Sequence, residues 1–133
     1  MNIFCHIPRE NWIVDRMGIE FKAHSKHNVS FDKINEDTNI IWLLGSWCWN
    51  QIPINVLKSK KVVCTIHHEV PWKFDDNRKK TFLLRDQIVN EYLTYTKETA
   101  KLIFDLTGKT AKIIPHWINT KIWKHLNNSA EKI

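Results

Sequence analysis

Two histidines and a glutamate follow a short apolar run near the middle of the chain. Residues 62–66 form this run, and His67, His68 and Glu69 come directly after it, with Trp72 three residues later. Imidazole and carboxylate groups transfer protons and hydrogen-bond to hydroxyl groups, while indole rings stack on flat or ring-shaped ligands. The pattern indicates a ligand-binding site, although a buried strand followed by a plain polar loop explains it equally well.

Polar and aromatic side chains also follow the other apolar runs, whereas the segments that lead into those runs carry mainly Lys, Asp, Asn and Ser. If the runs are parallel strands of a doubly wound sheet, these side chains gather at the carboxyl edge, where such sheets bind ligands. We therefore expect a functional rim at this edge. Its members outside residues 67–72 are His6, Arg9, Glu10, Trp47, Trp49, Lys97, His116, Trp117 and Asn119.

The elements that position this rim alternate between strands and helices. We predict strands over residues 2–7, 28–31, 39–45, 62–66, 91–96 and 111–114, and helices over 12–24, 51–59, 75–88 and 97–107. Ile13, Met17 and Phe21 form one apolar stripe in the first helix, and Gly108 is the kind of residue that ends the last. This order predicts an α/β fold: a Rossmann-like, doubly wound and mostly parallel sheet of about six strands with helices on both faces.

Two expectations concern the core. The helix over residues 75–88 should bury Phe82, Leu83, Leu84 and Ile88, and Trp42 should lie inside the sheet layer. The cysteines Cys5, Cys48 and Cys64 are odd in number and lack metal-binding spacing, and those in strand-like runs should be buried free thiols.

Composition narrows the classes of protein. The chain has 133 residues, of which 43% are apolar and 26% charged, as is typical of a soluble domain. It shows no secretory signal and no apolar stretch of membrane-spanning length, which predicts a cytoplasmic location. The net charge of +6 favours anionic partners such as phosphorylated ligands, lipid head groups or nucleic acid, and the seven tryptophans suggest a binding surface.

Two segments carry a resemblance to a known family. Residues 65–69, Thr-Ile-His-His-Glu, and residues 113–123, Ile-Ile-Pro-His-Trp-Ile-Asn-Thr-Lys-Ile-Trp, resemble the N-terminal half of GT-B glycosyltransferases of the family 4 type. In that family a buried strand ends in a histidine that faces the active-site cleft. A later Ile-Pro-Asn-Gly-(Val/Ile)-Asp-x-x-x-Phe segment leads into the second domain. The order of elements is similar along essentially the whole chain.

The resemblance assigns roles to particular residues. His67 matches the cleft histidine, which is thought to contact the transferred sugar or to orient the acceptor, and it is therefore our candidate catalytic residue. In the later segment Pro115, Ile118 and Asn119 match the family pattern, with Trp123 at the Phe position. The remaining candidates for acceptor or sugar binding are Arg9, Glu10, Trp47, His68, Glu69, Trp72, His116 and Asn119.

The chain departs from the family in two places. His116 and Trp117 replace the usual Asn-Gly, which implies a different backbone turn. The loop over residues 7–12 also lacks the glycines that allow backbone contact with phosphate in many relatives, so Arg9 is expected to supply a charged contact instead.

The resemblance implies transfer of a sugar from a nucleotide-sugar donor to a glycan or lipid-linked acceptor. Residues 1–126 would form the acceptor-side domain and residues 127–133 a linker or tail. In the family a C-terminal domain, which this sequence does not include, binds most of the donor. We therefore do not expect the isolated domain to catalyse sugar transfer. We expect no cofactor, no metal and no nucleic-acid partner, and we leave open a peripheral contact with the inner surface of a membrane.

Other classes of protein share some of these sequence features. The histidines and Glu69 could gather around zinc, but adjacent strand residues point to opposite sides and no H-E-x-x-H motif is present. A nucleic-acid module would interleave basic and aromatic residues, and another doubly wound module would need a glycine-rich first loop or an acidic pocket. The main alternative is a stand-alone Rossmann-like module that binds a ligand or partner without catalysis.

Overall fold

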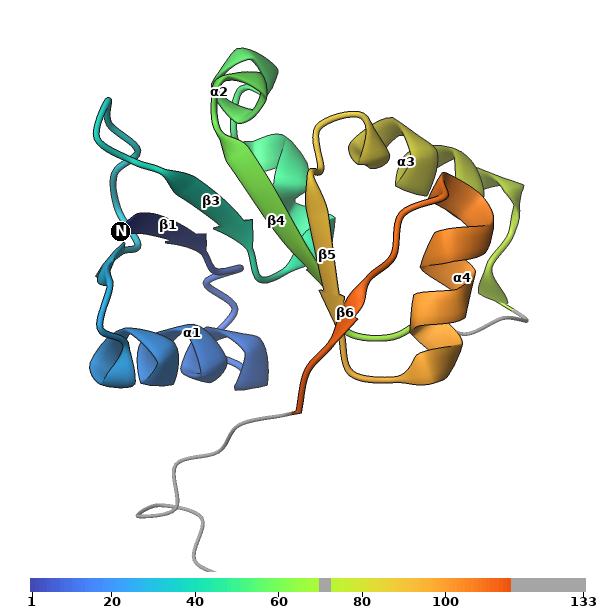
Figure 1. Cartoon of the computed structure of the whole chain (residues 1–133), viewed down its shortest axis with the longest axis horizontal. Helices are drawn as coiled ribbons and strands as arrows, with labels where there is room; N and C mark the ends of the chain where they lie inside the picture. The colour runs from blue at the N-terminus through green and yellow to red at the C-terminus, as the bar shows by residue number, and fades with distance from the viewer. Residues whose placement is uncertain (70–72, 116–133) are drawn as a thin grey trace, which may run out of the picture.

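A parallel sheet forms the centre of the protein. The computed structural model describes residues 1–69 and 73–115. Its strands are β1 (Asn2–His6), β2 (Asn28–Ser30), β3 (Ile40–Leu43), β4 (Lys61–Ile66), β5 (Glu91–Thr94) and β6 (Lys112–Ile113). The six strands lie in the order β2-β1-β3-β4-β5-β6, and every neighbouring pair is parallel (Figure 1). The Rossmann-like α/β fold predicted from the alternation of elements is confirmed.

Helices connect the strands, and the last two of them begin at polar residues that cap them. They are α1 (Ile13–His24), the 3₁₀ helix η1 (Ser46–Gln51), α2 (Ile54–Ser59), α3 (Asp76–Asp86) and α4 (Lys97–Thr107). Asp75 accepts a hydrogen bond from the Arg78 amide at the start of α3, and Thr96 accepts one from the Thr99 amide at the start of α4. Gly108 ends α4 with a φ of 75°, a left-handed conformation that glycine adopts without strain.

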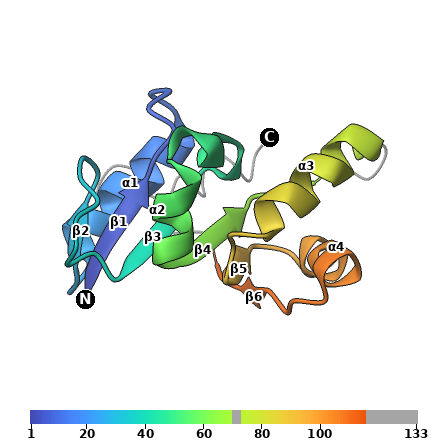
Figure 2. The ribbon, with the colours of Figure 1, turned by 90° about the horizontal axis from the view of Figure 1, so that it is seen from above.

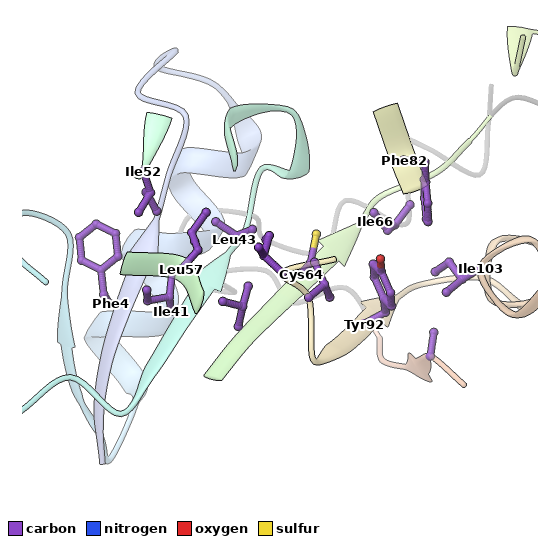
Figure 3. Close-up of a cluster of buried hydrophobic side chains, with 14 residues drawn as sticks. Phe4, Ile41, Leu43, Ile52, Leu57, Cys64, Ile66, Phe82, Tyr92 and Ile103 are labelled. Atoms are coloured by element: carbon purple, nitrogen blue, oxygen red, sulfur yellow. The ribbon is translucent and has the colours of Figure 1, made fainter. Parts of the chain in front are cut away.

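The two faces of the sheet are covered by different helices. On one face α1 packs through Val14 and Met17, beside the buried ring of Trp42. On the other face α2, α3 and α4 contribute to a larger cluster that includes Phe82 and Ile103. Figures 1 and 2 show α1 next to β1, with α3 and α4 side by side beyond β5. Figure 3 shows the Phe82 ring close to Tyr92 in the larger cluster.

All three cysteines are buried free thiols. Burial raises the pKa of Cys5 to about 12 and that of Cys64 to about 11. Both thiols are therefore neutral core groups at physiological pH, as expected for the two cysteines that lie in strands.

The buried side of α3 differs from the prediction. Phe82 and Ile88 are buried as expected, but Leu83 and Leu84 are 39% and 53% exposed. Arg85 is buried in their place, at 6% exposure. The helical period explains the difference, because residues 82 and 85 are three apart and share a face, while residues 83 and 84 turn away from it.

Residues 46–51 form a 3₁₀ helix that the sequence analysis did not predict. The helix expected over residues 51–59 is shorter, because Pro53 stands at its N-cap rather than within its first turn. Several strands are also one to three residues shorter than the apolar runs, since runs continue beyond the last ladder pair.

Gly18 allows α1 to approach the sheet closely. A Cβ atom at this position would lie 2.6 Å from Ile7 Cγ2 and 3.3 Å from Leu44 Cδ2.

We predict that Gly18→Ala lowers the thermal midpoint of unfolding, because overpacking costs roughly 1–3 kcal/mol and exceeds the gain of about 1 kcal/mol in helix propensity. Thermal unfolding by circular dichroism measures the change. Ile19→Ala, at an exposed neighbour, is the control; a stabilised Gly18→Ala variant would contradict the close packing.

Candidate functional site

A pocket of about 820 Å³ opens at the carboxyl edge of the sheet. Its walls come from the loop after β1 and the start of α1, from η1, from the residues after β4, and from one side of α3. This is the edge at which doubly wound sheets bind ligands. The lining residues are Pro8, Glu10, Trp12, Ile13, Val14, Ser46, Trp47, Trp49, Asn50, Ile66, His67, His68, Glu69, Lys73, Asn77, Arg78, Thr81, Phe82 and Arg85.

The buried carboxylate of Asp15 organises the loop after β1. It accepts hydrogen bonds from the backbone amides of Arg9 at 2.8 Å, Glu10 at 2.7 Å and Trp12 at 3.3 Å. Arg9 and Asn11 adopt φ values of 59° and 56°, so the loop makes a tight turn around this carboxylate. These amides are the groups that a phosphate-binding first loop would offer to its ligand, and here a side chain of the protein already uses them.

The loop presents Glu10 to the pocket but not Arg9. Glu10 Oε1 accepts a hydrogen bond from Trp47 Nε1 at 2.9 Å, which links the loop to η1. Arg9 donates instead to the carbonyl of Phe31 at 2.9 Å and to Asp32 at 3.1 Å, and it does not line the pocket. The charged contact expected from Arg9 is therefore not placed at the site, because acceptors after β2 bind its guanidinium.

His67 is held in one orientation at the end of β4. Its Nε2 lies 2.8 Å from the carbonyl oxygen of Leu44, and because a carbonyl only accepts, Nε2 is the donor. The imidazole ring is close to the rings of Trp47 and Tyr95, with centroids 6.0 Å and 5.4 Å away. Burial raises the pKa of Tyr95 to about 12, so the neighbouring phenol is neutral. The candidate catalytic residue thus lines the pocket, and one of its ring nitrogens binds the backbone.

The two residues after His67 also line the pocket. His68 is exposed to solvent, and the carboxylate of Glu69 lies 3.7 Å from Nη1 of Arg78. This ion pair joins the end of β4 to α3. The structure therefore brings together six residues predicted from the sequence: Glu10, Trp47, Trp49, His67, His68 and Glu69.

Other predicted site residues are Trp72, His116 and Asn119. They lie outside the described residues, as do Trp117, Trp123 and most of the segment that resembles the family's hinge.

His6 serves the fold rather than the pocket. Its Nε2 donates to the carbonyl of Cys48 at 3.1 Å, and this hydrogen bond connects η1 to the end of β1. Burial lowers the pKa of His6 below its ordinary value of 6.5; the charge of Arg9 acts in the same direction, while hydrogen bonds to Cys48 and Gln51 oppose the shift.

Sequence reasoning missed the wall that α3 contributes. Asn77, Arg78, Thr81 and Arg85 recur at helical spacing on the side of α3 that faces the pocket. Polar residues at this spacing normally mark a solvated face, so the signal was present but ambiguous. Trp12 was also missed; it lines the pocket and is 70% exposed.

Arg85 has unusual surroundings for a charged residue. Its guanidinium carbon lies 4.7 Å from the centroid of the Phe82 ring. Within residues 1–69 and 73–115, neither Nε nor Nη2 has a hydrogen-bond partner, although both atoms are buried. An unpaired buried donor costs roughly 1–3 kcal/mol, and more when it is charged.

In the described ranges no three His, Cys, Asp or Glu side chains gather closely enough to hold a metal ion. No helix within those ranges is both long and apolar enough to cross a membrane.

Comparison of the chain with protein-family models, with curated proteins and with solved structures finds no match.

Asp15 provides a test of how the first loop is held. We predict that Asp15→Asn lowers the free energy of unfolding by about 2–3 kcal/mol, because charge-assisted hydrogen bonds to three amides of the first loop are lost. Urea unfolding at neutral pH measures this change. Asp105→Asn, at an exposed residue paired with Lys101, should alter stability by less than about 0.5 kcal/mol. Equal effects of the two variants would show that Asp15 is not the anchor.

His6 gives the fold a pH dependence whose sign can be worked out. Its pKa is lower in the folded chain, so the unfolded chain binds more protons below pH 6.5, and the stability that His6 contributes is lost as the pH falls. We predict that the difference in unfolding free energy between wild type and His6→Gln shrinks between about pH 7.5 and pH 5. His27→Gln, at an exposed histidine, is the control. A difference that stays constant or grows would contradict the assignment.

Proposed function

We propose that the chain is the acceptor-side domain of a GT-B glycosyltransferase, which transfers a sugar from a nucleotide-sugar donor to a glycan or lipid-linked acceptor. The observation that carries the proposal is the mixture of groups in the pocket. Exposed indole rings of Trp12 and Trp47 line it together with the carboxylates of Glu10 and Glu69 and the imidazole of His68.

This mixture suits a polyhydroxylated ligand. Trp12 is 70% and Trp47 49% exposed, and large aromatic surfaces left in solvent beside a pocket are typical of binding sites. The apolar face of a sugar ring stacks on indole, while its hydroxyl groups donate to carboxylates and imidazole. Glu10 also fixes the Trp47 ring through a 2.9 Å hydrogen bond, so this part of the surface is formed before a ligand arrives.

In the proposed reaction the acceptor hydroxyl attacks the anomeric carbon of the donor as the bond to the nucleotide diphosphate breaks, and the proton of the hydroxyl passes to the departing diphosphate. The contribution of this chain is to hold the acceptor in place and to orient its reacting hydroxyl beside His67. The resemblance of residues 65–69 to the family's histidine segment supports this role for His67. A second domain would bind the donor and stabilise the departing diphosphate.

One observation favours the alternative, a stand-alone module that binds a ligand without catalysis. His67 Nε2 donates to the Leu44 carbonyl, as expected of a histidine that stabilises a strand end. A module that binds nucleotides is less favoured, because Asp15 accepts hydrogen bonds from the first-loop amides that would bind a phosphate.

Tryptophan fluorescence tests ligand binding directly. Titration with mono- and disaccharides should give saturable changes, whereas nucleosides, which carry the base and ribose without a phosphate, should give none. Trp47→Ala should weaken sugar binding by up to about tenfold, because a stacked aromatic ring is removed. Phe104→Ala, at an exposed ring on α4, is the control. Binding of nucleosides but not sugars would overturn the proposal in favour of a nucleotide-binding module.

Transfer is tested with the natural gene product and nucleotide-sugar donors. If His67→Ala abolishes transfer but preserves sugar binding, the catalytic role is supported. If the wild-type gene product binds sugars and transfers none, the stand-alone binding module is the correct assignment.

A further inference from the structure

Arg85 lacks a counter-ion within the described part of the protein. The nearest acidic residue in sequence is Asp86, but its carboxylate accepts hydrogen bonds from Tyr92 at 2.7 Å and from Lys109 at 2.9 Å. Two other ionisable groups, Cys64 and Tyr92, lie near enough for the Arg85 charge to act on them. Burial raises the pKa of the Cys64 thiol and that of the Tyr92 phenol well above their usual values. Neither group therefore supplies a negative charge at physiological pH.

The guanidinium is nevertheless placed for binding. Arg85 lines the pocket at 6% exposure, and its guanidinium carbon lies over the Phe82 ring. Arg78, on the same side of α3, brings a second guanidinium to the pocket. In this region the charged lining residues are Lys73, Arg78 and Arg85 against Glu69, so the local balance is positive. Glu10, the other acidic lining residue, is hydrogen-bonded to Trp47.

We propose that the α3 side of the pocket is a phosphate subsite, in which Arg85 is the buried anchor and Arg78 the second ligand-binding arginine. A guanidinium in a desolvated setting binds phosphate oxygens through paired, charge-assisted hydrogen bonds. A bound phosphate would supply acceptors for the unpaired Nε and Nη2 atoms of Arg85. Such a phosphate would compete with Glu69 for Arg78, whose present ion pair is long at 3.7 Å.

The subsite implies that the acceptor of the proposed glycosyltransferase is phosphorylated. This identification of the acceptor rests on the function proposed above. Its ligand chemistry is a phosphate ester attached to a hydroxylated group. A soluble sugar phosphate and a lipid-linked phosphate both have this chemistry. The positive net charge of the chain would favour the approach of either.

Inorganic phosphate is the first probe, with sodium chloride at equal ionic strength as the reference. In the wild type we expect millimolar phosphate to raise Tm and to shift the Nε–H resonance of Arg85 in ¹⁵N-correlated spectra. Arg85→Met should abolish the phosphate effect on Tm. Without phosphate its Tm should equal or exceed that of the wild type, because an unpaired buried charge has been replaced by an apolar side chain of similar length.

Two surface variants keep the test decisive if Arg85→Met does not fold. Arg78→Gln should weaken phosphate binding by about tenfold, whereas Arg16→Gln, at an exposed arginine of α1 outside the pocket, should leave it unchanged. The subsite is refuted if wild-type Arg85 shows no resonance shift with phosphate. It is also refuted if Arg85→Met keeps the phosphate effect, or if it loses stability in phosphate-free buffer while folding normally.

Further probes separate the two sources and the two proposals. Tighter binding of glucose phosphate than of inorganic phosphate supports a soluble acceptor. Arg85-dependent sedimentation with phosphatidylcholine vesicles that contain phosphatidic acid supports a lipid-linked one. Phosphate binding without any sugar binding would refute the proposed function and leave the subsite intact, while sugar binding without phosphate binding would do the reverse.

Discussion

The pairing of buried backbone polar groups governs the carboxyl edge of this sheet. Strands end there and their ladders stop, so side chains must satisfy the amides and carbonyls that remain. Asp15 accepts from the amides that turn the first loop, His67 donates to the carbonyl of Leu44, and the Thr94 hydroxyl donates to the carbonyl of Ile66. Because each bond crosses between segments, the same contacts that complete the fold also fix the walls of the pocket.

This constraint explains how much of the molecule could be predicted from the sequence. The alternation of apolar runs with amphipathic segments was sufficient for the fold, because it depends on periodicity alone. The segments that follow β1, β3 and β4 were correctly expected to meet, since parallel strands end at one edge. Whether a polar residue there faces the ligand or the backbone depends on local geometry: Glu10 faces the pocket, but His6 and Arg9 bind carbonyl oxygens elsewhere.

The wall formed by α3 could not be predicted for a different reason. Sequence patterns assign leucines to the core and arginines to solvent, because that arrangement has the lower free energy in most helices. In α3 Leu83 and Leu84 are exposed and Arg85 is buried, so the pattern fails at three adjacent positions. Local rules fail most often where a protein tolerates a loss of stability for its function. The failure therefore indicates α3 as part of the site more strongly than any motif in the chain.

The walls of the pocket make different demands on a ligand. The indoles of Trp12 and Trp47 offer stacking surface beside Glu10, whereas α3 offers the guanidinium groups of Arg78 and Arg85. A neutral sugar would leave Nε and Nη2 of Arg85 without a partner among the described residues, and a bare phosphate would leave the indoles in water. Only a ligand that joins a hydroxylated ring to an anionic group would suit both the indoles and the guanidinium groups. Its ring would stack on the indoles, and its anionic group would pair with the buried guanidinium.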